Sequence, residues 1–149
     1  MKKLIVLISA FLLISLMGFT QIIAPEKIPA EVKQAFAKKF PKATDIKYEM
    51  GKKDYEVSFK ENGVVISANF NSSGEWLETV TIINESDLPK KVLTSIAKNF
   101  VGFMITEVSK VVSSKKVVYY EMYLKTNKKG YDVEFSPIGV VLKKTKLRK

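Results

Sequence analysis

The sequence contains neither cysteine nor histidine. Their absence excludes disulfide bonds, thiolate nucleophiles, Cys/His zinc sites, covalent haem attachment and Ser-His-Asp triads. It also removes the one side chain that ordinarily titrates near neutral pH. Any chemistry would have to rest on Asp, Glu, Lys, Tyr or Ser, and we expect no cofactor and no metal site.

Acidic residues are scarce relative to basic ones. The chain has 15 Asp and Glu against 25 Lys and Arg, which gives a formal net charge of +10. Apolar residues are not scarce: they make up 46% of the chain and include nine Phe, six Tyr and one Trp. The length of 149 residues is that of one ordinary domain or two very small ones, and such a composition can form a packed core.

The first 20 residues have the pattern of an export signal. Met1 is followed by two lysines, and residues 4–19 then form a 16-residue run without charge. The apolar part of a signal peptide has about 7–15 residues, and a membrane-spanning helix needs about 20. We expect a signal peptide over residues 1–20, with cleavage before Gln21 or, further on, near Ala24. An uncleaved N-terminal anchor is the alternative.

Export places the protein in the periplasm or outside the cell. No cysteine follows the apolar run, so a bacterial lipoprotein anchor is excluded. Removal of residues 1–20 takes away two lysines and leaves 23 basic against 15 acidic residues, a net charge of +8. Without disulfides, the exported chain must be stable from its core alone.

The remaining chain consists of two tandem copies of one sequence unit. Residues 28–40 align with residues 88–100 with five identities, and residues 55–77 align with residues 120–142 with seven. Chance would give roughly one or two identities in such windows. The identical pairs are Pro29/Pro89, Val32/Val92, Ala37/Ala97, Lys38/Lys98 and Phe40/Phe100, then Tyr55/Tyr120, Glu56/Glu121, Lys60/Lys125, Asn62/Asn127, Phe70/Phe135, Gly74/Gly139 and Leu77/Leu142.

The repeat divides the chain. The offset grows from 60 to 65 residues, so five residues are inserted between positions 100 and 120, and the polar stretch 113–116 predicts that they form a longer loop. The predicted organisation is a signal peptide (1–20), a short linker (21–27), repeat 1 (28–87), repeat 2 (88–145) and a basic tail (146–149).

The residue pattern of each repeat predicts a short helix followed by about four antiparallel strands. Apolar residues recur every fourth position over residues 32–40 and again over 92–100, as on one face of a helix. Apolar and polar residues then alternate, and Asn62-Gly63 is a strong signal for a two-residue hairpin. We therefore expect an α+β fold: two tandem α-β-β-β-β repeats, an antiparallel sheet of about eight strands, and two short helices on one face.

These residues resemble a known family. A signal peptide is followed by two copies of a Leu/Ile-Pro-x-x-Val-x-x-x-(Phe/Ile)-Ala-Lys-x-Phe helix, each with a later Tyr-Glu-(Val/Met) strand. This order is similar to that of the PepSY-like proteins, also described as putative β-lactamase-inhibitor-like. The resemblance covers residues 28–145 and implies tandem α+β repeats with a helix-free, often concave sheet surface. It implies a binding or inhibitory role and carries over no catalytic residues.

The helix-free face is the candidate partner-binding surface. Alternation places charged and aromatic side chains there, and exposed aromatic residues bury much area at interfaces with few rotors. The alternative is that the tyrosines only cover the sheet. The partner would be a protein or peptide, and the candidate residues are Tyr119, Tyr123, Lys125, Glu121, Glu56, Lys60 and Trp76.

Two other functions compete with this one. The lysine-rich shell could bind an anionic envelope polymer or membrane surface, with about 1 kcal/mol per basic residue near a charged surface. We expect no nucleic-acid partner, because the protein is exported and the lysines are dispersed. Catalysis by carboxylates such as Asp132 and Glu134 would need a pair about 5–10 Å apart, and no phosphate loop or serine elbow supports it. The sequence favours a non-enzymatic module.

Overall fold

The computed structural model describes residues 21–147; the predicted signal peptide and the last two residues of the tail lie outside the described residues. No helix within that range has the length and apolar character needed to cross a membrane. The helices are α1 (Ala30–Lys39) and α2 (Lys90–Asn99), with short 3-10 turns η1 (Pro25–Lys27) and η2 (Glu85–Asp87). The strands are β1 (Gln21–Ile22), β2 (Thr44–Met50), β3 (Asp54–Glu61), β4 (Val64–Asn71), β5 (Trp76–Ile82), β6 (Met104–Ser113), β7 (Val118–Lys125), β8 (Gly130–Phe135) and β9 (Val141–Lys146).

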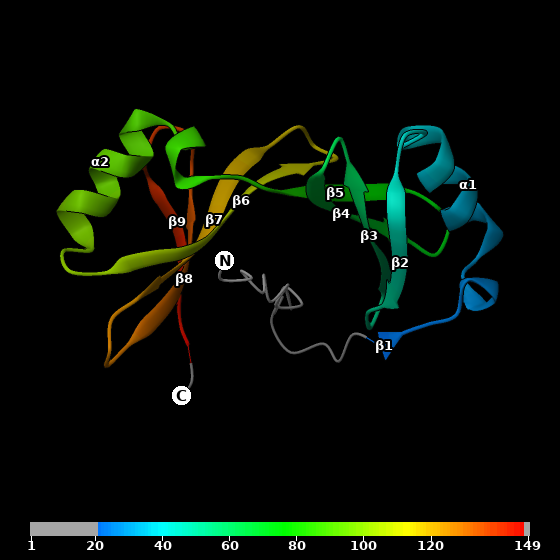
Figure 1. The fold of residues 1–149 in the computed structure, drawn as a ribbon, viewed down its shortest axis with the longest axis horizontal. Helices are drawn as coiled ribbons and strands as arrows, with labels where there is room; N and C mark the ends of the chain where they lie inside the picture. The colour runs from blue at the N-terminus through cyan, green and yellow to red at the C-terminus, as the bar shows by residue number, and fades with distance from the viewer. Residues whose placement is uncertain (1–20, 148–149) are drawn as a thin grey trace, which may run out of the picture.

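All nine strands form one antiparallel sheet in sequence order, β1 to β9. The two repeats join where β5 pairs with β6, from Glu78 opposite Ser113 to Ile82 opposite Ser109. Figure 1 shows that the sheet arches and that α1 and α2 lie on its outer side, one at each flank. The predicted α+β fold of two tandem repeats is confirmed, with β1 added to the eight expected strands.

The first repeat packs α1 onto β3 and β4. Val32 and Phe36 are fully or almost fully buried, and the Phe36 ring meets the Phe59 ring edge-on with centroids 5.1 Å apart. Phe70 lies at the same junction, 6.4 Å from Phe36. Truncation of such a buried aromatic side chain typically costs about 3–5 kcal/mol, so these contacts hold the helix on the sheet.

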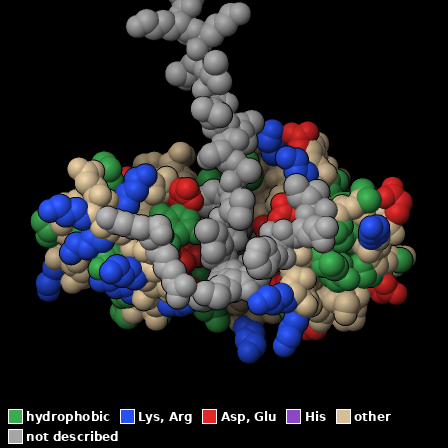
Figure 2. Space-filling model, turned by 90° about the horizontal axis from the view of Figure 1, so that it is seen from below, with side chains coloured by type: hydrophobic (Ala, Val, Ile, Leu, Met, Phe, Trp, Pro, Cys, Tyr) green, Lys and Arg blue, Asp and Glu red, His purple; other side chains and the backbone are tan. Residues whose placement is uncertain are grey.

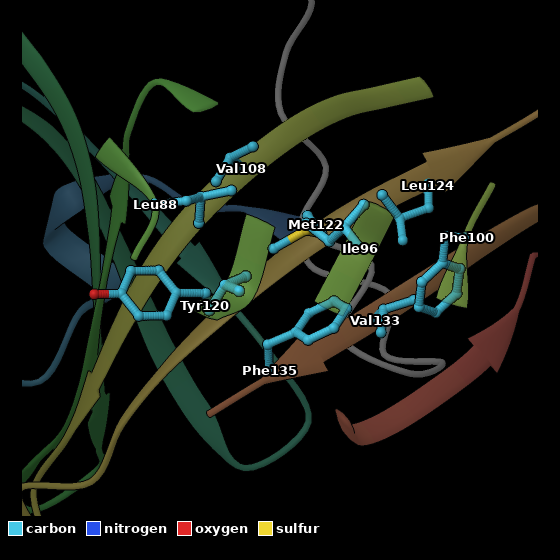
Figure 3. Close-up of a cluster of buried hydrophobic side chains, with 10 residues drawn as sticks. Leu88, Ile96, Phe100, Val108, Tyr120, Met122, Leu124, Val133 and Phe135 are labelled. Carbon is cyan, nitrogen blue, oxygen red and sulfur yellow. The ribbon is translucent and has the colours of Figure 1, made fainter. Parts of the chain in front are cut away.

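The second repeat packs α2 onto β7 and β8 in the same way. Ile96 and Phe100 project from the helix toward Met122, Val133 and Phe135 of the sheet (Figure 3). The predicted apolar stripes are therefore the faces that bury against strands. Each helix begins directly after its proline, Pro29 or Pro89.

Two local features recur in both repeats. Gly74 and Gly139 both have positive φ, 81° and 82°, and both lie against the helix. A Cβ at Gly74 would meet the backbone oxygen of Glu31, and a Cβ at Gly139 would meet that of Lys91, the equivalent residue of α2. No side chain fits at either place, which explains why glycine occupies both positions.

The second recurring feature is a β-bulge. The register between β4 and β5 shifts so that Glu78 faces Asn69 but Trp76 faces Phe70, which leaves Leu77 unpaired. The register between β8 and β9 shifts likewise and leaves Leu142, the residue aligned with Leu77, unpaired. The duplication thus extends to irregularities of the backbone.

Two sequence expectations were incomplete. The five inserted residues do not form mainly a loop, because β6 has ten residues against seven in β2, while the following turn grows only from residues 51–53 to residues 114–117. The extra residues lengthen β6 and pair with residues of β5 and β7.

The segment 21–27, expected to be a linker, contains β1 and η1, and Ile23 packs against the first core cluster.

Candidate functional site

The side of the sheet away from both helices is the inner side of the arch (Figure 1), and we call it the concave face. Its residues follow from the strand pairing, because directly paired residues share a side of the sheet. The concave face carries, from β2 to β9, Lys47, Glu49, Glu56, Ser58, Lys60, Ser67, Asn69, Glu78, Val80, Glu107, Ser109, Val111, Tyr119, Glu121, Tyr123, Lys125, Asp132, Glu134 and Lys143.

Six of the seven predicted binding residues lie on this face, in two groups. Tyr119, Glu121, Tyr123 and Lys125 follow one another along β7, while Glu56 and Lys60 lie on β3. Strands β4, β5 and β6 separate the groups, and four strand spacings of about 4.8 Å amount to about 19 Å measured along the arched sheet. A partner that touches both groups would have to span the seam between the repeats.

Trp76 lies on the other side, so its placement on the helix-free face was wrong. The bulge at Leu77 turns Trp76 to the helix side, beside Phe70. Lys39 of α1 lies over its ring at 3.7 Å from the centroid, and its Nε1 donates to Thr79 Oγ1 at 2.9 Å. Trp76 covers the edge of the first core and does not belong to the candidate surface.

Three carboxyl groups gather where β7, β8 and β9 meet. Glu121 faces Glu134 directly across the strands, and Asp132 lies diagonally, sharing a hydrogen bond with Glu121. Burial first, and then the charges of Asp132 and Glu134, raise the pKa of Glu121 to about 7. Burial also raises the pKa of Asp132, whose Oδ1 is buried without a hydrogen-bond partner among the described residues.

Lys143 on β9 partly neutralises this group. Its Nζ lies 2.9 Å from Glu134 Oε1, and that hydrogen bond raises the pKa of the lysine. Lys143 therefore lies close enough to act on all three carboxyl groups. A positively charged or hydrogen-bond-donating group of a partner would neutralise the negative charge that remains.

Glu78 links the group on β7 to the first repeat. Asn69 Nδ2 donates to its Oε1 at 3.1 Å, and the Tyr119 hydroxyl donates to its Oε2 at 3.5 Å. Burial first, and the nearby Glu78 second, raise the pKa of Tyr119. Sequence reasoning missed Glu78, because the strand that carries it looked apolar on both sides.

The first repeat contributes a smaller polar group. Burial raises the pKa of Glu56, and Glu49, Asp54 and Glu78 add to the effect, while a hydrogen bond from Ser67 opposes it. Lys60 lies at the end of β3 and its Nζ contacts Asp45 Oδ2 at 2.8 Å.

The seam itself is apolar. Val80 faces Val111 where the two repeats join, and Val111 faces Tyr119. Both valines are buried, 4% and 0% exposed, and most polar neighbours on the concave face are half-buried. The two valines therefore lie beneath the surface of the concave face, and the half-buried side chains around them, such as Tyr119, are the ones that a partner can contact.

The charge of this face differs from that of the whole molecule. Among the residues named above for the concave face, seven are acidic and four are basic, whereas Figure 2 shows both Lys/Arg and Asp/Glu side chains over the surface seen from below. Among the described residues, no three acidic side chains are arranged to hold a metal ion. The arrangement suits recognition of donors and cations on a partner.

A family model matches most of the chain. The sequence profile described as "Putative beta-lactamase-inhibitor-like, PepSY-like" matches residues 19–67 and 53–143. No protein of the curated set matches the chain.

Several solved structures share the fold. A DUF2874 family protein from Bacteroides uniformis is 21% identical with a TM-score of 0.75, over 79% of this chain and 88% of that one. A protein from Bacteroides eggerthii described as "putative periplasmic" is 23% identical with a TM-score of 0.75, over the same shares, 79% and 88%. A BLIP-like protein from Bacteroides fragilis is 23% identical with a TM-score of 0.71, over 81% of this chain and 88% of that one. At these identities the similarity establishes the fold alone.

Proposed function

The chain belongs to the PepSY-like family described as "putative beta-lactamase-inhibitor-like", and from this premise we propose that it is a non-enzymatic exported module that holds a protein or peptide partner on the concave face. The observation that carries the proposal is the single arched sheet with both helices outside, in which no helix of residues 21–147 covers the concave face. If the partner surface bound to the concave face contains the partner's active site, binding would inhibit the partner.

The composition of the concave face supports a protein or peptide partner. Tyr119 and Tyr123 lie four residues apart on the same side of β7, and Tyr119 faces Val111 at the seam between the repeats. Tyrosine is enriched among the few interface positions that dominate binding energy. Carboxyl groups at the rim would then select the partner by charge, mainly through the rate of association.

Periplasmic localisation is part of the same proposal. Structural relatives from Bacteroides eggerthii and Bacteroides fragilis are described as a "putative periplasmic" and a BLIP-like protein. The N-terminal signal pattern of this chain supports the same compartment.

The experiment is affinity capture from envelope extract with three forms of the exported protein. Wild type is compared with a Tyr119→Ala/Tyr123→Ala double variant and with an Ile138→Ala/Leu142→Ala double variant. The second variant removes apolar side chains that are 64% and 52% exposed elsewhere. Circular dichroism and thermal unfolding confirm that all three forms are folded.

We expect the tyrosine variant to bind its partner at least about tenfold more weakly, since hot-spot truncations cost about 2 kcal/mol or more. The control variant should bind as wild type does. Equal recovery of the partner by all three forms would defeat the assignment of the concave face.

A further inference from the structure

A second feature lies away from the concave carboxyl groups, at the tip of the β7–β8 hairpin. A pocket of about 650 Å³ opens between this tip and the C-terminal end of β9. Its volume is in the range of small-molecule sites, about 300–1,000 Å³. Among residues 21–147, no acidic residue lines it, and four lysines do: Lys125, Lys128, Lys129 and Lys146.

The backbone around the pocket is fixed by hydrogen bonds. The Thr126 amide donates to the Lys129 carbonyl at 2.8 Å, and Thr126 Oγ1 accepts from the amides of Lys128 and Lys129 at 3.2 Å each. The Leu147 amide donates to the Gly130 carbonyl at 2.9 Å, which holds the end of β9 against the hairpin. Three chain segments that carry lysines are therefore held at one place.

The hairpin does not require the two lysines of its turn, Lys128 and Lys129. In the first repeat, Gly63 and Val64 occupy the positions that Lys128 and Lys129 occupy in the second, and the hairpin closes there without a lysine. The ion pairs found within residues 21–147 use Lys60 and Lys143, and none of the four pocket lysines. The backbone thus brings four exposed lysines together, and no carboxylate of the described residues lines the pocket, which favours an anionic guest.

We propose that this pocket binds phosphate groups, carried either by a lipid headgroup or by a free phosphate compound. Lysine ammonium groups act as mobile point charges, so several of them can contact the different oxygens of one or two phosphates. Leu147 adds an apolar wall beside the charges. The site belongs to the second repeat alone and shares only Lys125 with the concave face, and its phosphate binding does not depend on a partner there.

The test measures binding of two probes to the protein purified after export. Tripolyphosphate is titrated by calorimetry, and vesicles of phosphatidylglycerol with phosphatidylcholine are compared with phosphatidylcholine alone by co-sedimentation. The site variant is Lys125→Gln/Lys128→Gln/Lys129→Gln/Lys146→Gln. The control is Lys42→Gln/Lys52→Gln/Lys53→Gln/Lys115→Gln, which removes the same charge from exposed positions elsewhere.

We expect wild type to bind at least one probe and the site variant to bind it at least about tenfold more weakly, while the control loses less than about threefold. Binding of tripolyphosphate without vesicles identifies free phosphate as the source, and binding of vesicles alone identifies the headgroup. Equal losses in the two variants, or no binding of either probe by wild type, would overturn the proposal. Thermal unfolding of all forms separates loss of the site from loss of the fold.

Discussion

Glu121→Gln should stabilise the protein at alkaline pH and leave it unchanged at acidic pH. Burial and the neighbouring Asp132 and Glu134 raise the pKa of Glu121 from 4.5 to about 7 in the folded protein. The folded state therefore binds a proton that the unfolded chain has lost, so stability falls as pH rises between these two values. Glutamine resembles the protonated acid and removes this dependence.

The magnitude follows from the difference in pKa. A change from 4.5 to about 7 corresponds to at most about 3.4 kcal/mol at 1.36 kcal/mol per pKa unit. Glu121 is only partly buried and titrates together with Asp132, so solvent screening and sharing of the proton reduce the effect. We expect a gain of about 1–2 kcal/mol in the free energy of unfolding above about pH 8.

The assay is urea denaturation of wild type and Glu121→Gln at about pH 5 and at about pH 8. Glu107→Gln is the control, since Glu107 lies on the same face, opposite Tyr123 on the neighbouring strand. The gain should be confined to Glu121→Gln at the higher pH. A stability difference that does not change with pH, or a loss at pH 8, would refute the argument that Glu121 is held protonated by its surroundings.

Two further changes test the repeat architecture and the position of the tryptophan. Gly139→Ala should lower the free energy of unfolding by at least about 2–3 kcal/mol, because positive φ adds about 1–2 kcal/mol to a Cβ clash with the Lys91 carbonyl. The control Gly63→Ala has only the cost of positive φ, since no described atom lies within 4 Å of a Cβ there. Similar urea midpoints for the two variants would contradict the contact between Gly139 and Lys91. Lys39→Ala should cost about 0.5–1 kcal/mol and alter the emission of Trp76, whose ring the lysine covers; unchanged fluorescence would show that the pair is not formed.

Much of the fold follows from periodicity in the sequence. The apolar stripe of α2 and the alternation along β7 fixed which sides would be buried, because the two patterns differ in period and each needs one apolar face. Asn62-Gly63 identified its hairpin, and both residues do have positive φ, 51° and 80°. The duplication supplied a second copy of each signal and so confirmed the order of elements.

The errors have local physical causes. Simple alternation puts Trp76 beside Glu78, but the bulge at Leu77 reverses the side on which Trp76 lies. Strand β1 is too short to show any period, since it spans only Gln21–Ile22.

The candidate site was only partly accessible to sequence reasoning. Alternation named Glu121 and Asp132 as members of one face, but their hydrogen bond depends on the register between β7 and β8. The lysine pocket depends on where Leu147 meets Gly130, a contact between residues that no motif connects.

The most direct measurement is photo-crosslinking in the intact envelope, with a photoreactive residue introduced at Tyr119 on the concave face or at Lys98 on the exposed side of α2. Position 119 should give one discrete protein adduct, and excess wild-type protein should compete it away. Position 98 should give none. The same adduct from both positions, an adduct from position 98 alone, or none from position 119 would contradict a partner held on the concave face.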